Sequence, residues 1–300
     1  MKIVLGIERE AEPATTLLNR LKFPEGRVDV VHILAPSDYL TYGVDMGLTP
    51  GEVERIVSHE DRDARSRLAD AAKALEARYR VETHLLFGPP ARDLGRHAAL
   101  EHADLVAVNA AHTHSESVAA LTGSVARSLV MGASQSVLVA RGAATKLSEH
   151  RPLRVVFATD HSEYANRCWE AFLRFAPGGV EHVGVVSAFP KGRLDAAQEL
   201  LPKMGVSLAE ALRDETLKRN DALIARTRHQ LFAHELTFAS YAIPEPIHEA
   251  IDHAMDSSSA DLLILGAKGH SLIERLTLGS VSMRQAIAGA YSTLILRVDQ

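Results

Sequence analysis

The stretch SADLLILG at residues 259–266 places a buried-type apolar run between an aspartate and a glycine, and HADLVAVN at residues 102–109 repeats it. Three more pairs of segments match at nearly the same offset: KIVLGIE with RVVFATD, VDVVHILAP with EHVGVVSAFP, and TGSVARSLV with LGSVSMRQAI. Self-similarity at a fixed offset is the signature of a duplicated structural unit. The sequence therefore predicts two copies of one domain, residues 1–141 and 152–300, joined by the polar segment RGAATKLSEHRP.

The composition is that of an ordinary globular protein. Hydrophobic residues make up 46% of the 300 residues and charged residues 24%. The net charge is −5, and the basic residues are scattered along the chain. We therefore expect the protein to bind neither nucleic acid nor an anionic membrane. A single cysteine, Cys168, excludes an internal disulfide framework and favours a reducing compartment. Because the sequence also shows no signal-peptide pattern and no apolar run of membrane length, we expect a cytoplasmic protein.

Each half alternates short apolar runs with segments of helical periodicity. The runs are rich in β-branched residues and apolar on both faces, which is typical of buried parallel strands. Such alternation predicts a doubly wound α/β domain, an open parallel sheet with helices on both faces. The strands predicted in the second half are 153–158, 182–188, 235–241, 261–265 and 293–297, and the helices are 162–175, 207–233, 245–256 and 280–289.

The segment GAKGHSLIERLTLGS at residues 266–280 lies between a predicted strand and a predicted helix. Glycine lets backbone N–H groups approach a ligand closely, and a helix N-terminus adds oriented donors with a partial positive charge. The segment therefore predicts a phosphate-binding loop. Glycines at a strand end and before a helix are also common turn and capping chemistry, so the spacing alone leaves that alternative open.

The pattern G-x2-G-x9-G-S in this segment resembles the ATP-binding signature of the universal stress protein family, and the two-fold repeat resembles a tandem member of it. The resemblance implies two five-stranded parallel sheets of the adenine-nucleotide alpha-hydrolase-like fold, with ATP, which can carry Mg²⁺, as the cofactor. The segment TDHSEYA fits the first loop of the family, in which Asp160 would hold the ribose or adenine. Ala188 stands where the family usually has a valine whose backbone faces the adenine. The residues that the resemblance assigns to the nucleotide are Asp160, Ala188, Gly266, Gly269, Gly279 and Ser280.

The first half departs from that pattern. Asn109 and His112 stand at or beside the first two glycine positions, and Glu8 replaces the aspartate, although Gly123 and Ser124 are retained. A side chain at each close-approach position should crowd out a triphosphate. We therefore expect a degenerate nucleotide site in the first half and one ATP per chain, with Gly123 and Ser124 serving as a helix cap.

Three other groups could carry chemistry, and each has an ordinary structural interpretation that we favour. His112 and His114 resemble a pair of metal ligands but fit an exposed loop. His248, Asp252 and His253 share one predicted helix, where a surface side-chain pair is the simpler hypothesis. Cys168 has helical spacing with Phe172, which indicates core packing in place of a catalytic thiolate.

The apolar runs SVLVA (136–140) and STLILRV (292–298) would be exposed edge strands if each half stood alone. We expect them to pair inside one chain and make an internal pseudo-dimer, while a homodimer of the whole chain is also allowed.

Two main classes of function fit these observations. The favoured one is an ATP-binding regulatory or stress-response protein. The alternative is an enzyme, either a slow adenine-nucleotide hydrolase or one that transfers a phosphoryl or adenylyl group. The sequence offers Lys268 in the glycine loop, but no GxxxxGK[ST] loop and no SGGxDS pattern. A structural adaptor without a ligand would leave the coincidence of Asp160 with the glycine motif unexplained.

Overall fold

The computed structural model describes residues 1–35, 45, 47–110, 123–142, 151–189, 208–230, 236–268 and 279–298. No helix among these residues is long and apolar enough to cross a membrane.

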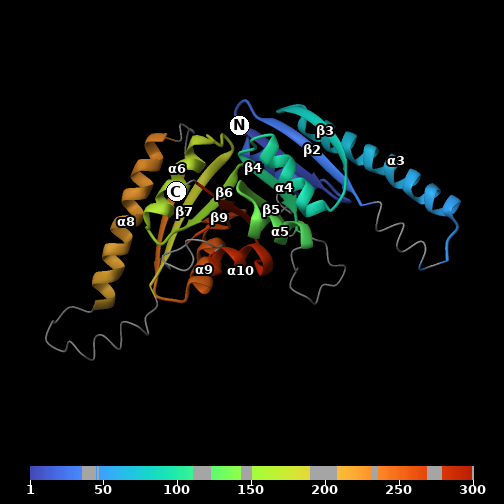
Figure 1. Ribbon diagram of the computed structural model, residues 1–300. Helices are drawn as coiled ribbons and strands as arrows, with labels where there is room; N and C mark the ends of the chain where they lie inside the picture. The colour runs from blue at the N-terminus through green and yellow to red at the C-terminus, as the bar shows by residue number, and fades with distance from the viewer. Residues whose placement is uncertain are drawn as a thin grey trace.

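A continuous ten-stranded sheet forms the centre of the molecule (Figure 1), in the order β3-β2-β1-β4-β5-β10-β9-β6-β7-β8. The strands of the first half are β1 (Lys2–Ile7), β2 (Arg27–Leu34), β3 (Arg80–Phe87), β4 (Leu105–Asn109) and β5 (Ser136–Ala140). Those of the second half are β6 (Leu153–Ala158), β7 (Val180–Ala188), β8 (Thr237–Ile243), β9 (Leu262–Gly266) and β10 (Ser292–Leu296). Neighbouring strands within each half are parallel, so the predicted tandem of doubly wound α/β units with five parallel strands each is confirmed.

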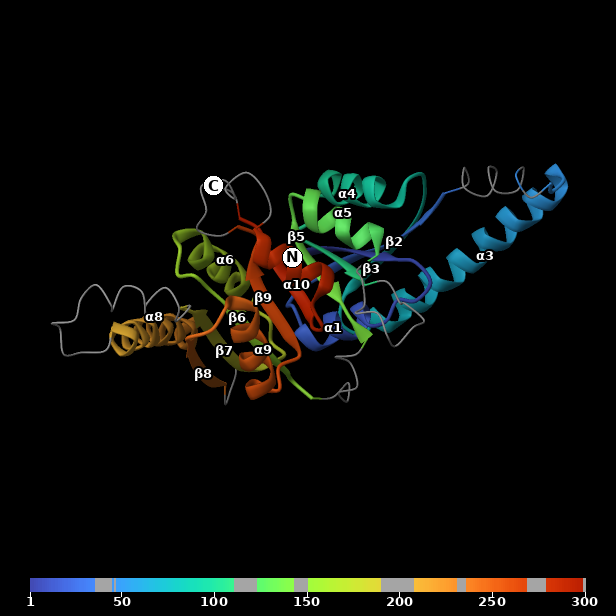
Figure 2. The ribbon, with the colours of Figure 1, turned by 90° about the horizontal axis from the view of Figure 1, so that it is seen from below.

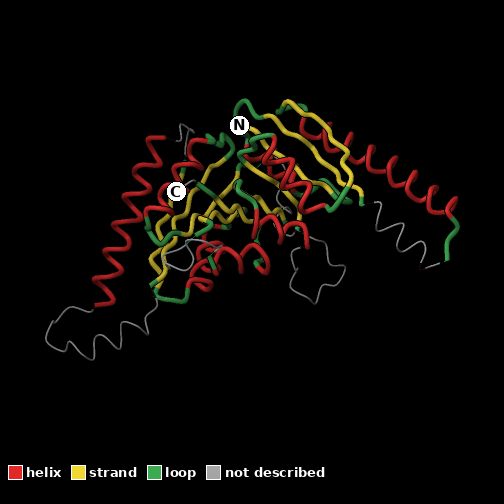
Figure 3. Tube along the Cα trace, viewed as in Figure 1, coloured by secondary structure: helices red, strands yellow, loops and turns green. Residues whose placement is uncertain are grey.

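Helices cover both faces of this sheet (Figure 2), as the crossover connections between parallel strands require. The helices of the first half are α1 (Ala14–Leu21), α3 (Pro50–Leu75), α4 (Pro90–Leu100) and α5 (Ser124–Gly132). Those of the second half are α6 (Glu163–Arg174), α8 (Leu208–Gln230), α9 (Ile247–Ser258) and α10 (Ser280–Ala288). The long helices α3 and α8 extend at opposite ends of the molecule (Figure 3).

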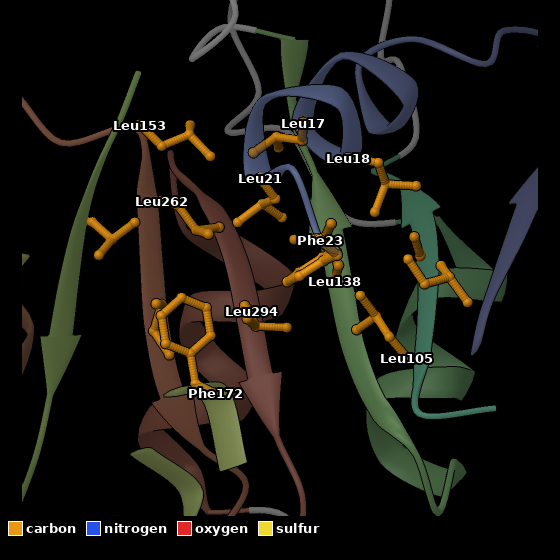
Figure 4. Close-up of a cluster of buried hydrophobic side chains, with 14 of the residues drawn as sticks. Leu17, Leu18, Leu21, Phe23, Leu105, Leu138, Leu153, Phe172, Leu262 and Leu294 are labelled. Atoms are coloured by element: carbon orange, nitrogen blue, oxygen red, sulfur yellow. The ribbon is translucent and has the colours of Figure 1, made fainter. Parts of the chain in front are cut away.

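One of three clusters of buried hydrophobic residues lies beneath α1, α3, α6 and α8 and crosses from one half to the other. Figure 4 shows leucines of α1 and of both halves of the sheet pointing into the same layer. Leu138 of β5 and Leu294 of β10 are fully buried at the junction. The two halves therefore share one apolar layer on this face.

The two halves meet through their last strands, as expected for an internal pseudo-dimer. β5 and β10 are antiparallel neighbours, with Leu138 opposite Leu294. Because each strand pairs on both sides, neither presents an open edge, and the predicted pairing of these apolar runs is confirmed.

Two arginines at matching positions tie each half to the other. The Arg141 Nη2 atom donates to the Ala286 carbonyl in the last turns of α10 at 2.6 Å. The Arg297 guanidinium donates to the Val130 carbonyl near the end of α5. The last carbonyls of a helix have no partner within the helix, so a cation placed there satisfies them and complements the helix dipole.

Element boundaries differ from the predicted ones by a few residues. β8 extends to Ile243, two residues beyond the predicted end, because the register continues through Ala188 opposite Ile243. It ends before Pro244, which has no N–H to donate to a neighbouring strand. Helix α8 is described from Leu208 to Gln230, and the predicted residues 207 and 231–233 lie outside the described part of the chain.

Candidate functional site

A hollow of about 270 Å³ opens at the carboxyl end of β6 and β9. These neighbours mark the point in the second half where the strand order reverses, because β7 continues the chain on one side of β6 and β9 returns on the other. Open α/β sheets bind ligands at this point. The lining residues are Ala158, Thr159, Asp160, Ala165, Ala188, Ile247, Leu265, Gly266, Lys268, Gly279, Ser280, Val281 and Ser282.

Five of the six residues assigned from the sequence thus lie around one hollow. Asp160 follows β6, Ala188 ends β7 and Gly266 ends β9, while Gly279 and Ser280 begin α10. The sixth, Gly269, lies outside the described residues. The fold therefore brings together segments that are more than a hundred residues apart in the chain.

The loop that carries Asp160 is held by its own side chains. The Ser162 N–H donates to the Asp160 carboxylate at 2.9 Å, and the Ala165 N–H donates to Ser162 Oγ at 3.1 Å. The second bond caps the N-terminus of α6, and the first forms a turn of the kind that Asp favours. Asp160 itself is exposed, at the mouth of the hollow.

A second network of hydrogen bonds holds the same loop through the side chain of His161. The His161 Nε2 atom lies 2.9 Å from Asn220 Oδ1, and Asn220 is fully buried on α8. Ser187 of β7 joins them, with its Oγ 3.1 Å from His161 Nε2. Burial lowers the pKa of His161, so the ring is neutral near pH 7 and takes part as a hydrogen-bonding group.

The start of α10 is joined to the end of β9 by two hydrogen bonds. The Gly279 N–H donates to the Ala267 carbonyl at 2.7 Å, and Ser282 Oγ donates to the Gly266 carbonyl at 2.6 Å. Gly279 is the N-cap residue of α10, and Ser280 is its exposed first residue. The partly positive end of the helix therefore borders the hollow beside the glycine backbone.

The polar groups of the hollow face an apolar wall. Ala158, Ala165, Ile247 and Val281 contribute hydrocarbon surface, and Lys268 contributes a cation whose Nζ lies 5.5 Å from the centre of the Tyr164 ring. A phosphate would meet the helix N-terminus and Lys268, while a flat apolar ring would meet the hydrocarbon wall. The residues present therefore fit a ligand that carries both a phosphate group and a flat apolar ring.

Sequence reasoning missed several of these residues. Ile247 and Ser282 carry no motif, since an apolar residue and a serine near the start of a helix are common. Asn220 sits within a strongly charged helix whose sequence gives no sign of a buried amide. Only Ser162 had a local signal, because a serine before a helical segment is a typical N-cap.

Cys168 lies on the buried face of α6 and belongs to the hydrophobic core, as predicted. Its Sγ lies 3.5 Å from the Leu296 carbonyl, and burial raises the pKa of the thiol to about 11. A thiol with such a pKa holds almost no thiolate near pH 7, and the thiolate is the reactive form.

We therefore expect the native protein to react with a thiol reagent at least about a hundredfold more slowly than the unfolded chain. Absorbance of the released chromophore in buffer and in denaturant measures both rates. Equal rates would mean that the thiol is accessible in the folded protein.

The corresponding place in the first half is filled by a side chain. Asn109 ends β4 as Gly266 ends β9. Its Nδ2 donates to the Glu10 and Glu12 carbonyls at 2.8 and 2.7 Å, and its Oδ1 accepts from the Ala14 N–H at 2.9 Å. Asn109 thus closes the loop after β1 and satisfies the N-terminus of α1, where the N-cap, a proline, makes no side-chain bond. This supports the expectation of a degenerate first site, which remains a prediction.

The other candidate groups show no metal centre in the described residues. His112 and His114 lie outside them. His248, Asp252 and His253 of α9 do not gather into a group of three ligands within the described part of the chain. His248 Nδ1 instead lies 3.3 Å from Gln285 Nε2 of α10.

Comparisons with known proteins agree with this architecture. A sequence model of the universal stress protein family matches residues 1–141 and again residues 153–286. A solved universal stress protein from Archaeoglobus fulgidus DSM 4304 is 15% identical, and the match covers 99% of this chain and 98% of the other, with a TM-score of 0.61. A functionally unknown protein from Pseudomonas aeruginosa PAO1 is 14% identical over 99% of this chain and 92% of the other, with a TM-score of 0.58. Because the sequence identities are this low, these two matches show a similar fold and nothing more. No curated protein matches the chain in sequence.

Proposed function

The chain belongs to the universal stress protein family, and we propose that its second half binds one ATP molecule and that the protein acts as a nucleotide-dependent regulatory or stress-response protein. The observation that carries the proposal is the hollow at the strand-order reversal, where Asp160, Gly266, Gly279 and Ser280 meet.

Four of the lining residues have specific roles in this proposal. Gly266 offers backbone without a side chain, and Ser280 offers a hydroxyl and the N-terminus of α10 to the phosphates. Asp160 accepts hydrogen bonds from the ribose or adenine, and the backbone at Ala188 faces the base. Gly269 belongs to the same phosphate loop by its place in the motif. Mg²⁺, when bound with ATP, would neutralise part of the phosphate charge.

Purified protein should bind ATP with a stoichiometry of one per chain. The reason is the asymmetry at the ends of β4 and β9, where Asn109 uses its amide for three internal hydrogen bonds and glycine leaves the matching place open. Calorimetric titration of nucleotide-free protein measures the stoichiometry, and denaturing the protein as purified releases any nucleotide that it carries. Two equivalent sites, or no binding, would contradict the proposal.

The alternative, slow hydrolysis, is tested on the same sample. ADP that accumulates over hours in proportion to protein, and is absent from a heat-denatured control, would assign enzyme activity to the site. An unchanged ATP pool supports a binding role.

A further inference from the structure

A cluster of two histidines and one carboxylate lies in the first half, away from the hollow described above. Asp29 is on β2, His84 on β3 and His97 on α4. Parallel pairing sets Val31 opposite His84, so Asp29 and His84 project from the same face of the sheet. Helix α4 packs on β2 and β3 (Figure 1) and brings His97 to both.

The atoms of this cluster converge on one point. His97 Nε2 lies 3.3 Å and His84 Nε2 lies 3.8 Å from Asp29 Oδ2, and all three atoms lie within 4.8 Å of one another. Asp29 is buried, and the side chain of His97 is only 12% exposed. The side chain of His84 is 29% exposed, although its Nε2 atom is buried.

One ring nitrogen of the cluster lacks a hydrogen-bond partner in the portion of the chain that the structure describes. His84 Nε2 is buried and has no hydrogen-bond partner among the described residues, although it faces the Asp29 carboxylate. A buried polar atom without a partner is costly, and each such atom calls for a ligand or a water molecule.

We propose that Asp29, His84 and His97 bind a divalent transition-metal ion such as Zn²⁺. In a tetrahedral zinc site with bonds of about 2.0–2.1 Å, the ligand atoms lie about 3.4 Å apart. The distances from the Asp29 oxygen to the two ring nitrogens are near this value before any adjustment. Two imidazoles and one carboxylate leave a fourth position for water or a small ligand.

Lys2 acts as the resident cation when no metal is bound. Its Nζ lies 3.1 Å from Asp29 Oδ2 and also pairs with Glu101. A metal ion that binds Asp29 would displace the ammonium group toward Glu101, which keeps it paired. Removing the Lys2 charge should therefore strengthen metal binding.

The test uses the full chain, freed of nucleotide so that phosphates cannot bind the metal. Zn²⁺ is titrated in competition with a chromogenic chelator, and Co²⁺ reports four-coordinate geometry by its visible absorption. We expect one Zn²⁺ per chain. Loss of a residue that only orients a metal ligand costs about 10- to 100-fold in affinity, so His84→Ala and His97→Ala should each weaken binding by at least about a hundredfold.

Two further variants make the result specific. His59→Ala removes an exposed histidine that pairs with Asp63 on α3, and it should leave zinc affinity unchanged. Lys2→Gln should tighten binding. His84 lies at the sheet edge and is partly exposed, so His84→Ala should fold even if His97→Ala does not. Absence of zinc binding by the folded wild type, or affinity unchanged in His84→Ala, would overturn the proposal, and neither result would bear on ATP.

Discussion

Ser280→Glu should abolish measurable ATP binding and leave the protein folded. Ser280 is the exposed first residue of α10 and lines the hollow. A carboxylate there would face the phosphates that the helix N-terminus is proposed to hold. Two like charges about 4 Å apart repel by about 4 kcal/mol at an effective dielectric constant near 20. That free energy weakens binding by about a thousandfold.

The fold should tolerate this change because an acidic side chain in the first turn of a helix complements the helix dipole. Ser124→Glu is the matched control, since Gly123 and Ser124 begin α5 of the first half as Gly279 and Ser280 begin α10. Calorimetry should show wild-type affinity for Ser124→Glu and none for Ser280→Glu, with equal circular dichroism. Unchanged affinity in Ser280→Glu would reduce the motif at residues 266–280 to a turn and a helix cap.

The order of the elements could be predicted because its signals are local. Apolar runs such as residues 259–266 repeat in both halves, and the alternation with helical segments predicts parallel strands. The pairing of β5 with β10 was also predicted from the sequence, because two apolar strands at exposed sheet edges are expected to be covered. The glycine motif located the end of β9 and the start of α10, because its spacing is fixed within one loop, and the resemblance to the family assigned Asp160 to the same site.

Contacts between distant residues could not be predicted in this way. Asn109 was expected to obstruct the first site, but its three bonds to the loop after β1 depend on how α1 is placed. Arg141 binds a carbonyl near the end of α10, and Arg297 binds one near the end of α5. Both contacts depend on the geometry of the β5–β10 junction. Arginine after a strand has no spacing that would indicate either bond. The cluster around Asp29 was missed because its three ligands come from separate elements and form no sequence motif.

One such distant contact links α1 to the start of β9. The Asp261 carboxylate is 2% exposed and lies 3.0 Å from Arg20 Nη2, and the Arg20 side chain is 3% exposed. Arg151 Nη2 also lies 3.0 Å from the carboxylate, and the Arg154 N–H donates to it at 3.0 Å. Asp261 therefore binds Arg20 of the first half and Arg151 of the segment that joins the halves, and it also accepts a hydrogen bond from the backbone at the start of β6.

Asp261→Ala should lower the free energy of unfolding by about 3–5 kcal/mol, because it leaves the buried Arg20 without its counter-charge. Asp104→Ala is the matched control. Asp104 precedes β4 as Asp261 precedes β9 and accepts from the Lys2 N–H at 2.7 Å, but it is exposed and pairs with no buried cation among the described residues. Its loss should cost about 1 kcal/mol, the typical value for one hydrogen bond. Urea unfolding followed by circular dichroism measures both variants.

A second substitution separates the effect of the unpaired Arg20 charge from the other effects of Asp261→Ala. Most of the cost of breaking a buried ion pair comes from the partner that is left unpaired, so Arg20→Met in the Asp261→Ala background should restore part of the lost stability. Arg151 is 32% exposed and can turn to solvent, so it needs no matching change. If the double variant unfolds at lower urea concentration than Asp261→Ala alone, Arg20 stabilises the contact between the halves through its packing and its bonds to the Arg151 and Pro152 carbonyls, and the buried ion pair is not the main source of that stability.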